Sequence, residues 1–271
     1  MTVKRGNLTR FSLLIIGFLT LILSIVYSAV EPSGPDTITV TNSSRGPAGD
    51  VSSPVTVQAQ AGNTTQLVIF DERSTQAWQG YFGNITGTVS LEDSSGKTFY
   101  DWAVANPRGE VYASNFTSVD WGQVHCLNVS QTNIDSVDDV VPSVRPDGSV
   151  SGINSTLVEL SYGINRTDID GLNETYDGFY SSNTGFFVGA LHFNGTDGCS
   201  LGNPYVNSAA SAAWDNVILS DNDTIIFTAI IREDASDFRN MASDFQLLVL
   251  ENGHVGLDTT TTPYYFYVEI S

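Results

Sequence analysis

Acidic side chains gather in two short stretches of the chain, and their oxygens are the ligands that hard cations prefer. Residues 167–175 (TDIDGLNET) and residues 220–223 (SDND) each place carboxylates within a few positions of one another. Calcium takes six to eight oxygen ligands, which makes these side chains candidate calcium ligands. Neither stretch has EF-hand spacing, and turns rich in Asp and Asn have the same composition, so a structural turn is the other interpretation. The candidates are Asp168, Asp170, Glu174, Asp221 and Asp223.

The three histidines do not form a catalytic group in the sequence. His125, His192 and His254 fall on separate predicted elements, and the chain has no HExxH pair and no Gly-rich phosphate loop. Residues 94–97 (SSGK) match SxxK by letters, but they fall in a predicted hairpin turn, where the penicillin-binding enzymes have the start of a helix. The sequence therefore favours a protein without catalysis, and it assigns no catalytic residue and no cofactor.

The chain carries eleven Asn-x-Ser/Thr sequons, the acceptor pattern for N-glycosylation. Asn7 precedes an apolar run and is expected to stay unmodified in the cytoplasm. The other ten predict a glycosylated exported domain, although a β protein rich in Ser, Thr and Asn would also collect sequons by composition. They are Asn42, Asn63, Asn84, Asn115, Asn128, Asn154, Asn165, Asn173, Asn194 and Asn222.

An uncharged apolar run of twenty residues lies near the N-terminus, at residues 11–30 (FSLLIIGFLTLILSIVYSAV). As a helix it would span about 30 Å, the thickness of a hydrocarbon core. Three basic residues precede it, at Lys4, Arg5 and Arg10, and acidic residues follow it. By the positive-inside rule, residues 1–10 are cytoplasmic and the bulk of the chain is extracellular. We therefore expect a single-pass protein of the cell membrane, in contact with the lipid bilayer through residues 11–30.

The exported part is strongly acidic. The whole chain has a net charge of −19, and the part after residue 30 holds all thirty acidic residues but only eight basic ones, a net of about −22. Such a surface cannot neutralise a run of phosphates, so a nucleic-acid partner is not expected. The charge suits solubility, high external salt or loosely held cations, and it is equally consistent with plain solvation of the surface. Envelope proteins and glycans are the partners that fit this location.

The two cysteines, Cys126 and Cys199, both lie in the exported part, where thiols are oxidised and paired. We predict one disulfide between them. In the chain-entropy model, closing a loop of about seventy residues stabilises the fold by about 4 kcal/mol. A metal site is the weaker interpretation, because neither cysteine has a second cysteine nearby and only His125 adjoins Cys126.

The elements that must position these residues are mostly strands. Residues 31–54 are rich in Pro, Gly and Ser and predict a stalk, and residues 55–271 predict one extracellular antiparallel β-sandwich. Residues 131–183 are rich in Asp, Asn, Ser and Gly and predict a loop-rich insertion. A three-strand meander is expected at 84–91, 98–104 and 110–114, where apolar and polar residues alternate. Further strands are expected at 66–70, 121–127, 157–162, 185–193, 224–231, 245–250 and 263–270, with short helical turns near 208–214 and 234–243.

Several segments carry a resemblance to known proteins. They are residues 78–87 (WQGYFGNITG), 99–102 (FYDW), 107–113 (PRGEVYA), 244–246 (DFQ) and 262–269 (TPYYFYVE). They resemble a recurrent, uncharacterised family of archaeal surface proteins with one N-terminal membrane segment and a β-rich exported domain, and the resemblance spans most of residues 75–271. The resemblance implies an archaeal envelope and transfers no functional site.

Three functions compete. The first is a membrane-anchored, N-glycosylated cell-surface protein with a structural, adhesion or binding role. The second is a pilin-like filament subunit cut after Gly6, although Arg10 interrupts the approach to the apolar run and the fifth residue after the cut is not Glu. The third is a secreted enzyme of unrecognised type.

Overall fold

We describe a computed structural model of the chain over residues 31–44, 56–69, 74–129, 141–144, 150–153, 155–165, 167–206, 209–210, 214–221, 223–251 and 261–270. The predicted membrane span at residues 11–30, its cytoplasmic flank and the sequons Asn154 and Asn222 lie outside these ranges. Within the ranges, no helix is both long enough and apolar enough to cross a membrane.

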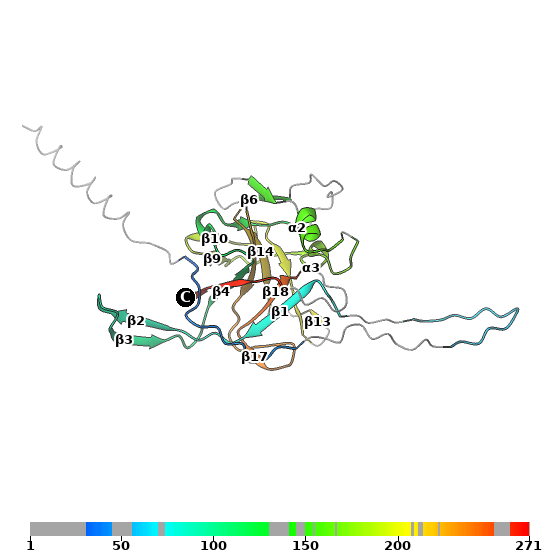
Figure 1. The fold of residues 1–271 in the computed structure, drawn as a ribbon, viewed down its shortest axis with the longest axis horizontal. Coiled ribbons are helices and arrows are strands. Elements are labelled where there is room, and N and C mark those ends of the chain that lie inside the picture. Colours follow the sequence, from blue (N-terminus) through cyan, green and yellow to red (C-terminus); the bar gives the residue numbers. More distant parts are fainter. Residues whose placement is uncertain are drawn as a thin grey trace, which may run out of the picture.

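A seven-stranded antiparallel sheet forms the centre of the domain (Figure 1). The strand order is β19-β4-β15-β14-β11-β8, and β5 also pairs with β14. The mainly β fold and the antiparallel pairing predicted from the sequence are confirmed. The strands are β4 (Gly109–Ser114), β5 (His125–Cys126), β8 (Gly178–Phe179), β11 (Ser200–Gly202), β14 (Asn216–Ser220), β15 (Ile225–Ile230) and β19 (Tyr265–Ile270).

Both faces of this sheet are buried. Successive residues of a strand point to opposite faces, and Ile226 packs into one hydrophobic cluster while Phe227 packs into the other. Every residue of β14 is buried, and in β15 only Ile230 is partly exposed. Burial on both sides explains why these strands read as almost unbroken apolar runs (NVILS and IIFTAI) rather than as an alternation. Fully burying one such side chain stabilises the fold by about 2 kcal/mol.

Different elements cover the two faces. Over the first face lies a two-stranded antiparallel sheet of β1 (Trp78–Gly83) and β18 (Phe245–Leu250), which contributes Leu247 and Val249 to the cluster containing Phe227. The second face is covered by the hairpin of β9 (Phe186–Val188) and β10 (Leu191–Phe193) and by the 3₁₀ turn η1 (Trp121–Gln123). The central sheet is therefore the middle layer of the domain.

Residues 131–183, expected to be a loop-rich insertion, hold paired strands and helices in their described parts and contribute several residues to the core. They contain the paired strands β6 (Val141–Val144) and β7 (Val150–Ile153) and the helices α2 (Ser155–Ser161) and α3 (Leu172–Thr175). Leu172 and Tyr176 are completely buried in the cluster of the first face. The described parts of this region belong to the body of the fold.

The predicted three-strand meander is wrong in its third member. β2 (Thr88–Glu92) and β3 (Thr98–Ala103) form the expected hairpin, but β4 pairs with β15 and β19 instead of β3. All residues of β2 and β3 are exposed, so the alternation did not mark a half-buried sheet. Alternation shows that a strand has an apolar face, but it does not say what covers that face.

Other expected elements have mixed outcomes. The strands at 224–231, 245–250 and 263–270 are confirmed, and the strand at 185–193 is a hairpin with Gly189 at φ +56° in its turn. The segment 121–127 is η1 followed by β5. The strand expected at 157–162 is wrong because this segment belongs to α2, and residues 66–69 form no strand.

In the described parts of 208–214 and 234–243, short strand pairs stand where helical turns were expected: β12 (Tyr205–Val206) with β13 (Ala209–Ala210), and β16 (Ala235–Ser236) with β17 (Ala242–Ser243).

Two extended segments project from opposite ends of the longest axis (Figure 1). The β2–β3 hairpin projects at the end where the chain from residue 31 and the C-terminus also lie. At the other end, residues 56–69 run out and back through a turn in which the Asn63 N–H donates to the Gln60 carbonyl (3.2 Å). In this second segment Val68 is 93% exposed and Ile69 is 85% exposed.

The segment that follows residue 30 is attached to the body. Ser33 forms an antiparallel bridge with Val268 of β19, with N–H to carbonyl distances of 3.2 and 2.9 Å. Pro32 is buried, and Glu31 lies against Gly189. The predicted stalk at 31–54 thus begins in contact with the domain rather than as a free linker.

Candidate functional site

The β2–β3 hairpin presents an apolar face that nothing in the described part of the chain covers. In its register Val89 faces Trp102 and Leu91 faces Tyr100, so these four side chains share one face. Trp102 and Tyr100 have ring centroids 4.6 Å apart. More than half of each of the four side chains is exposed. An aromatic and aliphatic surface of this kind is typical of interaction sites rather than of free surface.

The opposite face of the hairpin is polar. Ser90 lies across from Asp101, and Glu92 lies across from Thr98. At the tip, Asp93 Oδ1 accepts the N–H groups of Ser95 (2.8 Å) and Lys97 (3.0 Å), which fixes the turn. The SxxK letters at 94–97 therefore lie in a hairpin turn, as the sequence predicted. The hairpin is amphipathic, with its carboxylates kept off the apolar face.

A pair of carboxylates lies where the N-terminal segment meets the body. Glu110 of β4 and Glu269 of β19 are direct cross-strand partners, and Glu110 is only 4% exposed. Glu269 Oε2 accepts the Gly189 N–H (2.8 Å) and the Tyr112 hydroxyl (3.4 Å). The same Gly189 lies against Glu31, so the pair sits beside the attachment of the chain.

Burial raises the pKa of both carboxyl groups of this pair. Burial and the charge of Glu269 raise the pKa of Glu110 to about 8, partly offset by hydrogen bonds with the Phe187 backbone and Tyr112. Burial also raises the pKa of Glu269, offset by its bonds to Gly189 and Tyr112. Two carboxylates this close do not both ionise easily. Glu110 is therefore protonated at neutral pH, and the arrangement is a structural contact sensitive to pH.

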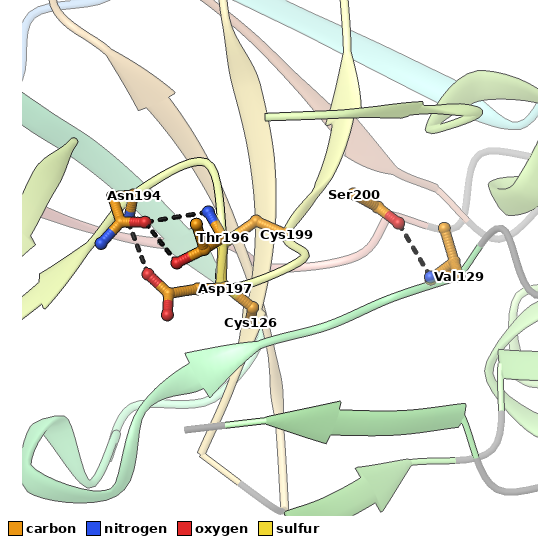
Figure 2. Close-up of a disulfide and its surroundings, with 7 residues drawn as sticks. All are labelled: Cys126, Val129, Asn194, Thr196, Asp197, Cys199 and Ser200. Carbon is orange, nitrogen blue, oxygen red and sulfur yellow. Dashed lines mark hydrogen bonds between the residues drawn. A yellow bond between two sulfur atoms is a disulfide. The ribbon is translucent and has the colours of Figure 1, made fainter. Parts of the chain in front are cut away.

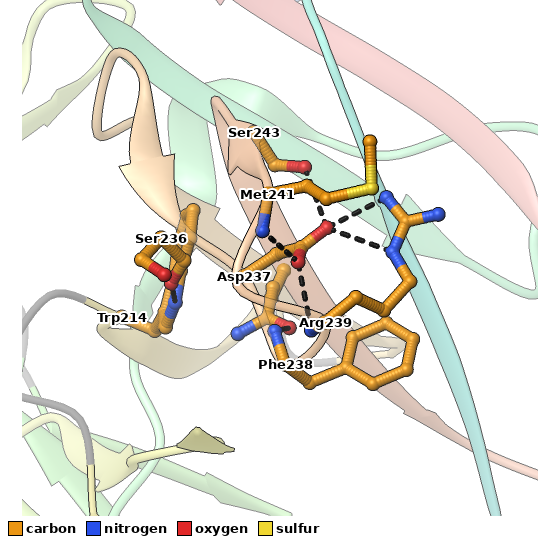
Figure 3. Close-up of polar contacts among 8 residues, drawn as sticks. Trp214, Ser236, Asp237, Phe238, Arg239, Met241 and Ser243 are labelled. Carbon is orange, nitrogen blue, oxygen red and sulfur yellow. Dashed lines mark hydrogen bonds and ion pairs between the residues drawn. The ribbon is translucent and has the colours of Figure 1, made fainter. Parts of the chain in front are cut away.

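The turn at residues 237–243 is a second candidate interaction surface (Figure 3). Asp237 is completely buried, and its Oδ1 accepts the N–H groups of Arg239 (2.8 Å) and Met241 (3.0 Å). Its Oδ2 accepts Arg239 Nη2 (2.7 Å), Arg239 Nε (3.0 Å) and the Ser243 hydroxyl (3.1 Å). Burial acts to raise the pKa of Asp237, but these hydrogen bonds outweigh it and hold the pKa below its usual value.

This turn displays aromatic and cationic groups. The Arg239 guanidinium lies 4.2 Å from the ring centroid of Phe82 and 5.6 Å from that of Phe238. The two rings are 4.9 Å apart in an edge-to-face arrangement, and both are partly exposed. Sequence reasoning missed this site, because Phe82 and Phe238 are far apart in the chain. The only local signal was an Asp two residues before an Arg and three before an Asn, the pattern of an Asx turn.

The predicted calcium ligands make hydrogen bonds within the protein. Asp221 Oδ1 accepts from the Thr224 N–H (2.8 Å), and its Oδ2 accepts from the Asp120 N–H (2.9 Å). Asp168 Oδ2 accepts the Asn165 N–H (2.8 Å), and Asp170 Oδ2 accepts the Thr75 hydroxyl (2.5 Å). Asp168 and the Oδ1 atom of Asp221 close local turns, as the alternative interpretation expected, whereas Asp170 and the Oδ2 atom of Asp221 bond residues far away in the sequence. Among the described residues no three His, Cys, Asp or Glu side chains converge as a metal site, and calcium stays a prediction.

The predicted disulfide is confirmed: Cys126 of β5 is bonded to Cys199, which precedes β11 (Figure 2). Both residues are buried in the cluster of the second face. The neighbouring residues 198–202 (GCSLG) match the GxSxG pattern of hydrolases by letters. Ser200 is completely buried in a strand, however, and its hydroxyl oxygen accepts the Val129 N–H (2.8 Å), whereas a nucleophile elbow exposes its serine at a strand-to-helix turn.

The described sequons lie at the surface to different degrees. Asn42, Asn63, Asn84 and Asn165 are exposed, and Asn115, Asn128, Asn173 and Asn194 are partly buried. The Asn194 side-chain oxygen accepts the Thr196 N–H (2.8 Å) and hydroxyl (2.7 Å), within a turn that its own backbone N–H closes on Asp197 (2.6 Å). Modification at each of these residues stays a prediction.

Comparison with known proteins gives no relative. No protein-family model matches the chain, and no curated protein and no solved structure is significantly similar to it.

Proposed function

We propose that the chain is a membrane-anchored, N-glycosylated protein of the cell surface, with a structural, adhesion or binding role and no catalysis. The observation that carries the proposal is the attachment of Ser33 to β19, three residues after the predicted span ends at Val30. This attachment supports the proposal because a span at residues 11–30 would then keep the β domain next to the membrane. The resemblance stated above favours an archaeal envelope as the setting.

The surface of the domain supports a binding role. Trp, Tyr and Arg dominate the energetically important positions of protein interfaces. The β2–β3 hairpin exposes Trp102 and Tyr100, and the turn at 237–243 exposes Arg239 with Phe82 and Phe238. Rigid hairpins and turns present such side chains at low entropic cost, because the backbone is fixed before a partner arrives.

The layered fold suits an exposed position. The domain is a sandwich in which the β1–β18 sheet packs on one face of the central sheet, and the Cys126–Cys199 disulfide lies on the other face. A disulfide persists in the oxidising setting that export implies. Exposed sequons such as Asn84 lie where an oligosaccharide could be attached without disturbing the core.

The proposal is tested on protein recovered from native membranes. Washing with alkaline carbonate should leave the chain in the membrane fraction, and peptides containing Asn42, Asn63 and Asn84 should carry glycan mass. Release of the chain by carbonate would overturn the anchoring, and unmodified mass at all three sites would overturn the glycosylation.

A further inference from the structure

The β2–β3 hairpin projects from the end of the domain at which the described chain begins, at residue 31 (Figure 1). Ser33 is held on β19, and three residues of extended chain reach at most about 10 Å. A span ending at Val30 therefore places this end of the domain close to the lipid head groups. The hairpin, the C-terminus and the segment beginning at residue 31 all lie at this end, and residues 56–69 point away from it (Figure 1).

The chemistry of the hairpin matches a membrane interface. Trp and Tyr concentrate at the level of the lipid head groups, where one part of the ring is apolar and another forms hydrogen bonds. Trp102 and Tyr100 form the aromatic half of the apolar face, and Val89 and Leu91 form the aliphatic half. Since Ser90, Glu92 and Asp101 lie on the other face, the apolar face can contact lipid without burying a carboxylate.

We propose that the apolar face of the β2–β3 hairpin lies on the bilayer that anchors the chain, as a second contact beside the predicted span. This inference rests on the anchoring proposed above. One helix leaves a domain free to rotate and tilt, whereas two contacts fix its orientation. With the hairpin on the lipid, the turn at 237–243 and the segment 56–69 would be presented in a defined direction to other envelope components.

Fluorescence of the full-length protein in vesicles tests the contact. The protein is reconstituted into phosphatidylcholine vesicles with or without bromine near the head-group end of the acyl chains, and it is floated with the vesicles after a carbonate wash. Bromine quenches only Trp side chains that it touches. Trp121 and Trp214 are buried and Trp78 packs against the first-face cluster, so only Trp102 is open to the bromine and we expect quenching of up to about a quarter of the emission of the four Trp residues.

Three variants sharpen the test. Trp102→Phe should lose the quenching, since it removes the reporter. Leu91→Asp places a carboxylate on the apolar face and should reduce the quenching while Trp102 remains. Ser90→Asp is the matched control, because it adds the same charge at the neighbouring position on the polar face, and it should behave like the wild type.

The outcomes separate this inference from the proposed function. A wild-type chain that floats with the vesicles but shows no quenching would overturn the hairpin contact and leave the anchoring intact. Quenching that persists in Trp102→Phe would also overturn it. A chain that does not float would overturn the anchoring and the hairpin contact together. Cross-linking of two copies through the hairpin, without quenching, would assign the apolar face to a second copy of this chain instead.

Discussion

The β2–β3 hairpin and the β14–β15 pair are both antiparallel and rich in apolar residues, but they have opposite surroundings. Each strand of the hairpin is exposed along its whole length, whereas β14 and most of β15 are buried on both faces. The difference lies in what covers them. The β14–β15 pair lies between two further layers, while the hairpin leaves the body altogether (Figure 1). Apolar residues in strands therefore serve as core in one region and as an outward surface in the other.

The largest expected effect is the loss of a core ring. Phe227 is 1% exposed and contacts the rings of Trp78, Tyr176 and Tyr264, at centroid distances of 6.1 to 6.4 Å. Phe227→Ala should lower the free energy of unfolding by about 4 kcal/mol, because it leaves a cavity in the first-face cluster. Trp102→Ala in the hairpin should change it by less than about 0.5 kcal/mol. Urea unfolding measures both, and equal losses would contradict the contrast between the two regions.

Opening the disulfide should have the next largest effect. Cys126 and Cys199 are 73 residues apart, and replacing both by Ser should cost about 3 kcal/mol. Thermal unfolding of the oxidised protein and of the double variant gives the difference. Each single variant should match the double one. A double variant as stable as the wild type would show that the link between β5 and the segment before β11 does not stabilise the central sheet.

The Glu110–Glu269 pair should make stability fall as the pH rises. The pKa of Glu110 is raised from its usual 4.5 to about 8 in the folded protein, so folding favours its protonated form. Its stabilising contribution is complete below about pH 4.5 and is lost as the pH rises to about 8. Glu110→Gln should remove this slope from the pH dependence of unfolding. An identical slope in wild type and variant would contradict the account of the pair.

The smallest effect is expected at the surface turn. The Arg239 side chain is 41% exposed, so Arg239→Ala should cost only about 0.5 kcal/mol despite its ion pair with Asp237 and its contact with Phe82. Asp237→Ala should cost about 2 kcal/mol, because it leaves the N–H groups of Arg239 and Met241 without an acceptor. Urea unfolding gives the free energy of unfolding of both variants. A larger loss in Arg239→Ala than in Asp237→Ala would show that the turn depends on the arginine.

The sequence predicted β15, β18 and β19 from strand-length runs rich in apolar residues. It missed β14 (NVILS), an apolar run of the same kind, and it also missed β1. In residues 157–162, expected to form a strand, Val158, Leu160 and Tyr162 alternate with polar residues, but positions 158 and 162 are also one helical turn apart. Leu160 of α2 is half-exposed, and Tyr162, the residue that follows the helix, is buried. The apolar pattern alone fits both the two-residue period of a strand and the 3.6-residue period of a helix.

The Glu110–Glu269 pair and the Phe82–Arg239 contact depend on residues far apart in the chain and were not predictable. Glu110 and Glu269 meet because β4 and β19 pair in one register, and Phe82 meets Arg239 because β1 lies beside the turn at 237–243. No local signal marks either pair. The disulfide was predictable because only two cysteines are present, and the acidic turns were identified although their composition fits a cap and a metal site equally.

Anchoring through residues 11–30 is tested by the mass of the N-terminal peptide of the protein recovered from native membranes. We predict a chain that starts at Met1 or Thr2 and still carries residues 11–30, with the domain attached next to the membrane through Ser33. A chain that starts at Asn7 would instead indicate a processed pilin-like subunit, and a chain that starts beyond residue 30 would show that the domain is released from the membrane, contradicting the anchored account.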